Sequence, residues 1–459
     1  MLDHRIRGKL LEIVGKAGVR EGQALRRHAI DGFLPRLVLF PNTPEEVGKI
    51  VVLALDEGLT IFPWGGGTQM GLGAPPRQVD LVVCLGRLDR ILDQDPENMT
   101  VTAEAGVRLG ALEESLRRMA PGFFFPLDPP CIEEVTLGGA VAANASGPSR
   151  LRYGTLRDMV LGTGVEILGV KGTGRKTHAG GKTVKNVSGY DMSKLYIGSL
   201  GTLAIIEEVT CRILPLPEER ATVLARFRET HSPWACVQAV LESQLIPSCI
   251  EVLNPQAALL LSPYLKSQTR ARAWSAVRIE GIREAVEHQV VEIQRMARSE
   301  GAEQISVLRG PKEVEFWRAL GRLGPKVCKG NAQSIGLKLS VPLSASHEIS
   351  TSIDDRAQKG SLPCYQLSHA GSGIVYAHMP LDEGLYSAKE QTLIQVVKAL
   401  REKAEETDGS LVVEYAPLVF KKKVDVWGEV GGVLPIMKRL KEEFDPRNIL
   451  NPDRYVGGI

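Results

Sequence analysis

The stretch that decides the fold is Pro63-Trp64-Gly65-Gly66-Gly67-Thr68-Gln69-Met70-Gly71, which follows an apolar run over residues 59–63. Consecutive glycines can adopt positive φ and leave no side chain between the backbone and a ligand. Successive amide N–H groups of such a loop can converge on a phosphate, and the Thr68 hydroxyl adds a donor. The alternative is an ordinary surface turn. The pattern predicts that the loop is a turn after a strand and that its amides suit a pyrophosphate.

Two other nucleotide-binding motifs are excluded by their spacing. A Rossmann fingerprint needs G-x-G-x-x-G, but Gly71-Leu72-Gly73 runs into Ala74-Pro75-Pro76, which lacks the third glycine and blocks a helix. Gly172-Thr173-Gly174 also lacks a third glycine at the required spacing. Gly181-Lys182-Thr183 is similar to the end of a P-loop, but Lys176 occupies the position where the motif needs a glycine. Neither NAD by the Rossmann route nor ATP by the Walker route is predicted.

The composition is that of a globular protein. The 459 residues are enough for two domains, and 43% of them are hydrophobic. The 56 basic and 54 acidic residues give a net charge of +2, so no nucleic-acid partner is predicted. The cluster Lys421-Lys422-Lys423 is expected to be a solvated loop or strand end.

The cysteines and the N-terminus indicate a cytoplasmic protein. The seven cysteines include no C-x-x-C pair, which argues against an iron–sulfur cluster or a structural zinc and is typical of a reducing compartment. Asp3, His4 and Arg5 stand where a signal peptide needs an apolar core. No stretch approaches the roughly 18 uninterrupted apolar residues of a membrane span. Any membrane association is expected to come through a partner.

The first half of the chain mixes helix and strand signals. Thr43 and Pro44 mark the start of a helix, Glu46 predicts a capping box, and Gly58 is placed to end the helix after residue 57. Strands are expected near residues 36–40, 59–63, 80–85, 99–107, 164–170 and 203–209. Helices are expected over residues 108–120, 137–145 and 433–444. Pro215 and Pro217 predict a domain boundary, and the fold class is α+β.

Five motifs in this order are similar to those of one family. They are Pro63-Trp64-Gly65-Gly66-Gly67-Thr68, Thr136-Leu137-Gly138-Gly139, Ala143-Asn144-Ala145-Ser146-Gly147, Tyr153-Gly154 and Gly198-Ser199-Leu200-Gly201-Thr202. The chain resembles the PCMH-type FAD-binding domain that vanillyl-alcohol oxidases, D-lactate dehydrogenases and glycolate oxidase share. Residues 184–191 and the C-terminal Phe444-Asp445-Pro446 and Leu450-Asn451-Pro452 are most similar to the FAD-binding E subunit of glycolate oxidase.

The resemblance implies a domain organisation. Residues 1–35 would form an N-terminal helical extension, and residues 36–217 a PCMH-type FAD-binding domain. An α+β cap, the substrate domain, would cover residues 218–423. Residues 424–459 would form a C-terminal segment with a helix that returns to the FAD domain.

The resemblance also implies a set of FAD-binding residues. The loop Pro63, Trp64, Gly65, Gly66, Gly67, Thr68, Gln69, Met70 and Gly71 would cradle the pyrophosphate. The second side of the cofactor would be lined by Pro129, Thr136, Gly138, Gly139, Ala143, Ser146, Gly147, Tyr153 and Gly154. The adenosine or ribityl portion would pack along Gly201, Thr202, Ile205 and Ile206. The loop has no histidine to bond covalently to the flavin, so non-covalent FAD is expected.

The catalytic motifs of the family are only partly retained. Its 2-hydroxy-acid dehydrogenases carry a metal-binding His-x-Gly-Asp-Gly-Asn-Leu-His and a later Glu-His. Here the corresponding residues are His369-Ala370-Gly371-Ser372-Gly373-Ile374-Val375-Tyr376 and Glu414-Tyr415. Catalytic roles are therefore assigned to His369, Glu414 and Tyr415. No metal site is expected, although His378 could replace the missing ligand at Tyr376.

Two functions remain open from the sequence. In the first, the protein is an FAD-dependent dehydrogenase of a small 2-hydroxy acid. In the second, it is an FAD-carrying electron-transfer subunit without substrate oxidation of its own. The chain has no second redox motif, so electrons on FAD must leave either to oxygen or to a partner. The resemblance to glycolate oxidase implies an iron–sulfur partner subunit, with a second flavoprotein subunit as a further partner.

Overall fold

The computed structural model describes residues 3–168, 175–182, 190–265, 273–329 and 333–459. The run at residues 184–189, which carries part of the glycolate oxidase resemblance, lies outside the described residues. So do residues 169–170 of one expected strand and the Gly172-Thr173-Gly174 motif.

The N-terminal quarter builds a small sheet covered by two helices. Helix α1 (His4–Val14) packs on α2 (Pro44–Glu57), and the strand order is β1-β2-β4-β3. The strands are β1 (Val19–Arg20), β2 (Leu37–Leu39), β3 (Ile61–Trp64) and β4 (Leu81–Cys84). Helix α2 begins as predicted, with Thr43 accepting from the Glu46 amide, and ends at Gly58, whose φ is 66°. The Glu46 carboxylate accepts from the Asn42 amide instead of completing a capping box with Thr43.

A second, antiparallel sheet continues the same core. Its strand order is β5-β6-β10-β8-β9, its helices pack on its own strands, and its buried residues share one hydrophobic core with those of the first sheet. The strands are β5 (Ile91–Asp95), β6 (Thr100–Glu104), β8 (Val160–Ile167), β9 (Arg175–Gly180) and β10 (Ile205–Arg212). The helices are α3 (Leu109–Met119), α4 (Leu137–Ala143), α5 (Arg150–Tyr153), α6 (Leu156–Met159) and α7 (Ser193–Tyr196). Two short strands, β7 (Phe123–Phe124) and β11 (Leu214–Pro215), pair with each other in a separate small sheet.

The following part of the chain forms an eight-stranded sheet in which every pairing is antiparallel. Its order is β15-β12-β14-β13-β17-β18-β16-β19. The strands are β12 (Glu219–Phe227), β13 (Cys249–Leu253), β14 (Ala273–Gly281), β15 (Ala302–Arg309), β16 (Ile335–Ser340), β17 (Tyr365–His369), β18 (Ile374–Met379) and β19 (Ser410–Tyr415). This sheet shares no strand with the two earlier ones.

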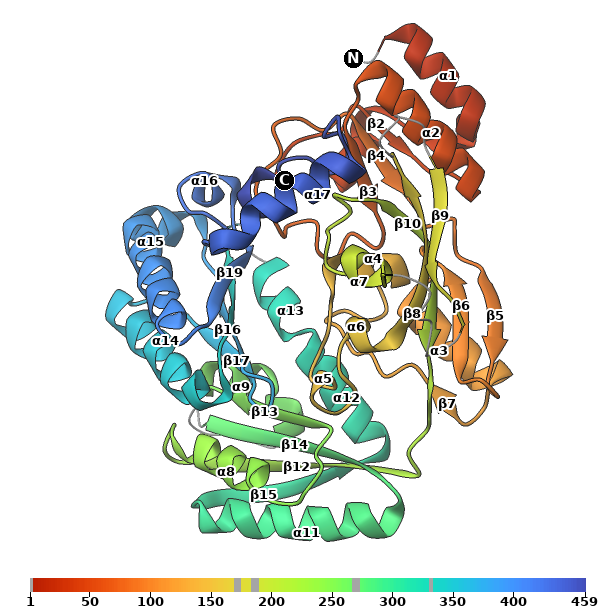
Figure 1. Cartoon of the computed structure of the whole chain (residues 1–459). Coiled ribbons are helices and arrows are strands. Elements are labelled where there is room, and N and C mark those ends of the chain that lie inside the picture. Colours follow the sequence, from red (N-terminus) through yellow and green to blue (C-terminus); the bar gives the residue numbers. More distant parts are fainter. Residues whose placement is uncertain (1–2, 169–174, 183–189, 266–272, 330–332) are drawn as a thin grey trace.

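Helices cover this large sheet on both faces. One face packs on α8 (Ser232–Leu241), α11 (Arg283–Ser299), α14 (Ser346–Gly360) and α15 (Glu383–Glu405). The opposite face packs on α9 (Pro255–Leu260), α10 (Ser262–Leu265), α12 (Gly310–Gly321) and α13 (Leu323–Lys329). Figure 1 shows α12 and α13 between the eight-stranded sheet and the N-terminal half, which builds the two smaller sheets. Residues on that face of the eight-stranded sheet therefore face the N-terminal half.

The C-terminal segment returns to the first sheet. After α16 (Leu418–Lys421) and α17 (Leu434–Phe444), the chain runs beside β3, where Ile61 donates to Ile449 and accepts from Asn451. In Figure 1 α17 leads from the end of the eight-stranded sheet, near β19, toward β3. No helix in the described part of the chain has both the length and the apolar character needed to cross a membrane.

Candidate functional site

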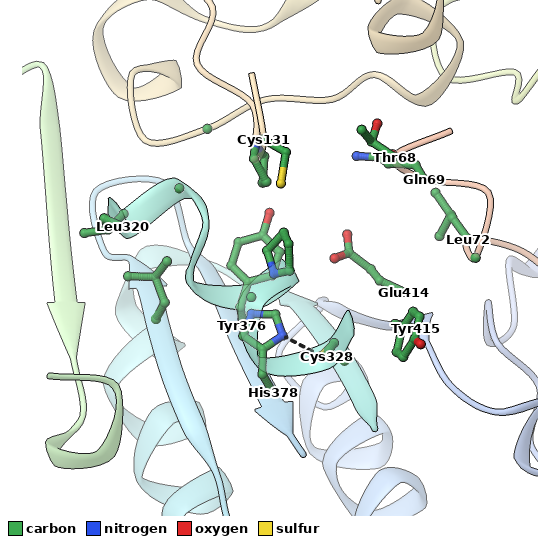
Figure 2. Close-up of a pocket in the computed structure, with 18 of the residues that line it drawn as sticks. Thr68, Gln69, Leu72, Cys131, Leu320, Cys328, Tyr376, His378, Glu414 and Tyr415 are labelled. Atoms are coloured by element: carbon green, nitrogen blue, oxygen red, sulfur yellow. Dashed lines mark hydrogen bonds between the residues drawn. The ribbon is translucent and has the colours of Figure 1, made fainter. Parts of the chain in front are cut away.

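The main cavity lies between the two halves of the protein, and both halves line it. The N-terminal half contributes Gly67, Thr68, Gln69, Gly71, Leu72, Asp128, Pro130, Cys131, Gly147 and Pro148. The eight-stranded sheet and helices α12 and α13 contribute Leu320, Gly321, Gly324, Pro325, Cys328, Gly336, Leu367, His369, Tyr376, His378, Glu414 and Tyr415. Figure 2 shows Thr68 and Gln69 across the cavity from Tyr376 and Glu414.

A second, smaller cavity lies on the other side of the glycine loop. It is lined by Pro63, Gly65, Gly66, Gly67, Thr68, Gln69, Met70, Leu72, Thr136, Gly139, Ala142, Ala143, Leu200, Asn451 and Arg454. The loop residues 67–69 and Leu72 line both cavities. An elongated ligand that follows the loop can therefore occupy both.

The glycines of the loop are required by close contacts within the protein. A Cβ atom at Gly65 would lie 2.1 Å from Oγ1 of Thr136, and one at Gly66 would lie 1.9 Å from the Glu134 carbonyl oxygen. Of the three consecutive glycines, Gly67 has positive φ, at 71°. The indole of Trp64 covers Gly67, where a Cβ atom would lie 2.6 Å from the ring.

The amides of the loop are available to a ligand. The N–H groups of Gly66, Gly67 and Thr68 donate no hydrogen bond to any of the described residues. Thr136 starts helix α4, its hydroxyl accepting from the Gly139 amide. The loop therefore faces the cavity with free backbone donors. The first turn of α4, whose amides donate to Val107, Ala105 and Thr136, lines the same cavity without bulky side chains. This arrangement fits a diphosphate.

Three buried charges hold the second half of the loop. Lys421 and Arg454 both pair with the Asp31 carboxylate, at 2.8 and 2.6 Å, and all three side chains are at most 6% exposed. The two cations also donate to five consecutive backbone carbonyls, those of Met70, Gly71, Leu72, Gly73 and Ala74. The expectation that Lys421 lies in a solvated cluster was wrong, because this ion pair buries it.

Other residues assigned to the cofactor have structural contacts. The hydroxyl of Tyr153 donates to Glu280 of the eight-stranded sheet at 2.8 Å, and the Ser146 hydroxyl accepts from Arg150. Several lie outside the lining of both cavities. They are Trp64, Pro129, Gly138, Ser146, Tyr153, Gly154, Gly201, Thr202, Ile205 and Ile206. Ile205 and Ile206 are buried in strand β10, and Gly147 does line the main cavity.

The β17–β18 hairpin brings three predicted ligand positions together. Tyr376 and His378 are two residues apart on one face of β18, and the His369 ring contacts Tyr376 edge to face. The Tyr376 and His378 rings are stacked, with an angle of 9° between their planes. Burial lowers the pKa of His369 to about 3 and of His378 to about 4, so both rings are neutral.

A β-bulge aims two adjacent residues at the main cavity. In the β16–β19 ladder Tyr415 pairs with Gly336 and Val413 pairs with Leu337, which leaves Glu414 as the extra residue. Neighbouring residues of a regular strand point to opposite faces, but the bulge lets Glu414 and Tyr415 both line the cavity. Burial raises the pKa of Glu414, while Lys338, whose ammonium lies 4.0 Å away, opposes that shift.

Two acidic residues of the site were not predicted from the sequence. Glu251 of β13 faces His369, its carboxyl oxygens 2.8 and 2.9 Å from Nδ1 of the ring. Asp128 lines the cavity and accepts from the amide and hydroxyl of Ser149, and burial raises its pKa to about 6. The described residues contain no group of three or more His, Cys, Asp and Glu side chains placed to hold a metal ion.

Comparison with protein families gives two matches that follow this geometry. Residues 35–177 match the FAD binding domain family. Residues 216–455, more than half of the chain, match the C-terminal domain of FAD linked oxidases. The protein is a member of the FAD-linked oxidase family. FAD is therefore the cofactor of this FAD-linked oxidase, as the glycine loop predicts.

Relatives of this FAD-linked oxidase match over nearly their whole length. It is 28% identical to the glycolate oxidase subunit GlcD of Bacillus subtilis over 92% of this chain and 89% of the relative. It is also 28% identical to a D-lactate dehydrogenase of Archaeoglobus fulgidus, over 92% of this chain and 91% of the relative. These matches confirm the predicted resemblance to glycolate oxidase subunits and D-lactate dehydrogenases.

Solved structures show the same fold at low sequence identity. The p-cresol methylhydroxylase structure superposes with a TM-score of 0.77 at 15% identity, over 98% of this chain and 96% of that chain. Alkyldihydroxyacetonephosphate synthase superposes with a TM-score of 0.72 at 18% identity, over 98% and 85% of the two chains. The predicted α+β, PCMH-type fold is confirmed.

Proposed function

We propose that this FAD-linked oxidase oxidises a small 2-hydroxy acid and passes the electrons to an iron–sulfur partner subunit. The observation that carries the proposal is the position of Glu414. This carboxyl group reaches the same cavity as Thr68 and Gln69 of the glycine loop. The names of the two relatives support the substrate class, because glycolate and D-lactate are both 2-hydroxy acids.

Oxidation of a 2-hydroxy acid removes a proton from the hydroxyl group and a hydride from the carbon that carries this hydroxyl group. FAD supplies the hydride acceptor when bound. The protein must supply the proton acceptor, and we assign this role to Glu414. The other carboxyl group that lines the cavity, that of Asp128, already accepts hydrogen bonds from the amide and hydroxyl of Ser149. Burial raises the pKa of Tyr376 and Tyr415, which makes their phenols poor bases, and lowers the pKa of His369 and His378. A carboxylate with a raised pKa is suited to general base catalysis.

The substrate carboxylate needs a cation, and Lys338 is the nearest to the proposed base. It lies opposite Tyr376 in the β16–β18 ladder, and its side chain is 28% exposed. The neutral His369 ring can donate a hydrogen bond in the same region. We assign Glu414 to the hydroxyl group, Lys338 to the carboxylate and His369 to substrate orientation, with Tyr415 as a wall of the cavity.

FAD is bound non-covalently in this proposal, because the loop that faces both cavities contains no histidine. Acid precipitation of the purified yellow protein should release the colour into the supernatant. Colour retained in the precipitate would show a covalent link and contradict this part of the proposal.

The partner is proposed from the chain's lack of another redox motif. The seven cysteines include no C-x-x-C pair, all seven are buried, and none of them forms a disulfide in the described part of the chain. The relative in Bacillus subtilis is named a subunit, which supports a multi-subunit complex for this chain too. Affinity purification from the native host should recover iron and acid-labile sulfide, with a second flavoprotein subunit as a further component. An iron-free chain that turns over rapidly with oxygen would contradict the partner.

The second candidate function is an electron-transfer subunit without substrate oxidation. It is favoured by Tyr376 and Tyr415, which stand where the dehydrogenases of this family are expected to carry histidines. Anaerobic titration of the holoprotein with glycolate, D-lactate and longer 2-hydroxy acids separates the two functions. Loss of flavin absorbance with at least one acid, abolished in Glu414→Gln at equal FAD content, supports the oxidase. No absorbance loss with any acid supports the electron-transfer subunit.

A further inference from the structure

The turn after Ile449 closes the smaller cavity from the C-terminal side. Its backbone is fixed to strand β3, because Ile61 donates to Ile449 at 2.7 Å and accepts from the Asn451 amide at 2.8 Å. Asn451 and Arg454 of this turn line the cavity together with the glycine loop and the first turn of α4. The turn is therefore part of the wall that faces the cofactor.

Asn451 has an unusual backbone and a fixed side chain. Its φ is 44°, in the left-handed region that asparagine tolerates better than most residues. Its side-chain Nδ2 donates to the Leu200 carbonyl oxygen, which settles the orientation of the amide. The carbonyl oxygen Oδ1 is buried and has no donor among the described residues. A buried acceptor without a partner is rare in native proteins.

We propose that Asn451 is an FAD-binding residue, and that its Oδ1 accepts a hydrogen bond from a hydroxyl or N–H group of the cofactor. An amide oxygen can only accept, so its partner must be a donor, and this excludes the phosphate oxygens. The donors that FAD offers are the ribityl and ribose hydroxyls, the flavin ring N–H and the adenine amino group. The strained backbone at Asn451 is then maintained because it aims this acceptor at the cofactor.

Arg454 has a different role in the same turn. Its guanidinium donates to Asp31 and to the carbonyl oxygens of Met70, Leu72 and Ala74, so its donors are directed at the protein. Arg454 positions the loop, whereas Asn451 has a polar atom left for the ligand. The inference needs reversibly bound FAD, as proposed above, but is independent of the substrate and of the electron acceptor.

The chain offers a matched control for Asn451. Asn448 lies in the same segment with φ of 49°, but it is exposed and lines neither cavity. Asn451→Gly and Asn448→Gly make the same chemical change and relieve the same left-handed strain. Holoproteins of both variants and of the wild type are incubated with isotopically labelled FAD, and the exchange of bound cofactor is followed by mass spectrometry.

We expect FAD to exchange roughly tenfold faster from Asn451→Gly, as for the loss of one buried hydrogen bond, and at the wild-type rate from Asn448→Gly. Equal exchange from all three proteins would overturn the proposal, and so would equal acceleration in both variants. Thermal unfolding with and without added FAD gives a second readout. The rise in unfolding temperature caused by FAD should shrink only in Asn451→Gly. An equal loss of stability with and without FAD would instead show an anchoring role alone.

Discussion

His369 and Glu251 face each other across the β13–β17 ladder, with Nδ1 of the ring 2.8 Å from the nearer carboxyl oxygen. Glu251 is fully buried, and His369 is its one hydrogen-bond partner among the described residues. A single donor is too few for a buried carboxylate, and burial raises the pKa of Glu251 well above its ordinary value. The carboxyl group therefore carries the proton and donates it to Nδ1, leaving the ring proton on Nε2.

The Glu251–His369 pair predicts that glutamine can replace Glu251. In Glu251→Gln the amide still donates to Nδ1, so the ring keeps its orientation and its Nε2 proton. Substrate-dependent loss of flavin absorbance, measured by anaerobic stopped flow, should stay within roughly threefold of wild type, whereas Glu251→Ala should slow it roughly tenfold or more. Both variants should retain FAD. If Glu251→Gln slowed flavin reduction as much as Glu251→Ala does, the Glu251–His369 pair would have to be charged.

The raised pKa of Glu414 predicts a pH profile. The carboxylate must be ionised to accept the hydroxyl proton, so flavin reduction should increase with pH through a value above the ordinary glutamic acid pKa of about 4.3. The positive charge of Lys338 lowers the pKa of Glu414 and favours the ionised form. Lys338→Met should therefore shift the profile to higher pH. An unchanged profile in Lys338→Met, or a shift to lower pH, would contradict Glu414 as the base.

Gly66 is predicted to be intolerant of even a methyl group. Alanine at this position places a Cβ atom 1.9 Å from the Glu134 carbonyl oxygen, so the loop must move away from helix α4. Gly66→Ala should therefore purify with little or no FAD, measured as absorbance per chain. Gly86→Ala is the control, because Gly86 is exposed and its Cβ atom would meet only the Cys84 sulfur at 3.8 Å. Full FAD content in Gly66→Ala would exclude this loop as the pyrophosphate site.

Glu207 predicts a loss of stability as pH rises. Burial raises its pKa to about 8, and no described residue forms a hydrogen bond to either carboxyl oxygen, although Lys176 lies 3.7 Å away. Between the unfolded pKa and about 8 the folded protein keeps a proton that the unfolded chain releases, so the free energy of unfolding falls with increasing pH. At pH 8.5 Glu207→Gln should unfold at a temperature on the order of a few degrees above that of wild type. At pH 5 the two proteins should unfold at similar temperatures.

The control for Glu207→Gln is Glu97→Gln, in which an exposed glutamate of the same half is changed. The difference in unfolding temperature between Glu97→Gln and wild type should not depend on pH. A Glu207→Gln protein that is less stable than wild type at both pH values would show that the carboxylate is ionised and paired in the folded state.

Local signals in the sequence predicted the local structure well. The bounds of helix α2, Pro44 and Glu57, could be predicted because the residues that set each end lie next to it in sequence. These are the capping residue and proline at the start and the glycine after the end. The glycine loop was recognisable for the same reason. The Glu134 carbonyl oxygen that crowds Gly66 comes from a distant segment, so this further reason for glycine could not be predicted from the loop itself.

The long-range parts of the site could not be read from the sequence. Glu251 is 118 residues from His369, and no local pattern links them. Lys421 is 390 residues from Asp31, and within its own lysine run it is indistinguishable from a solvated charge. The shared orientation of Glu414 and Tyr415 depends on a bulge in the pairing with β16, which a period-two strand pattern cannot indicate.

The cluster of Asp31, Lys421 and Arg454 also sets an order of events during biosynthesis. The glycine loop is made early, but the two cations that hold its carbonyls are translated 348 to 384 residues later. A nascent chain that has released only the FAD-binding half therefore still lacks both cations that brace the loop. Stable FAD uptake therefore belongs after translation, when the C-terminal turn has docked on β3. Chains stopped short of Arg454 should accumulate without flavin.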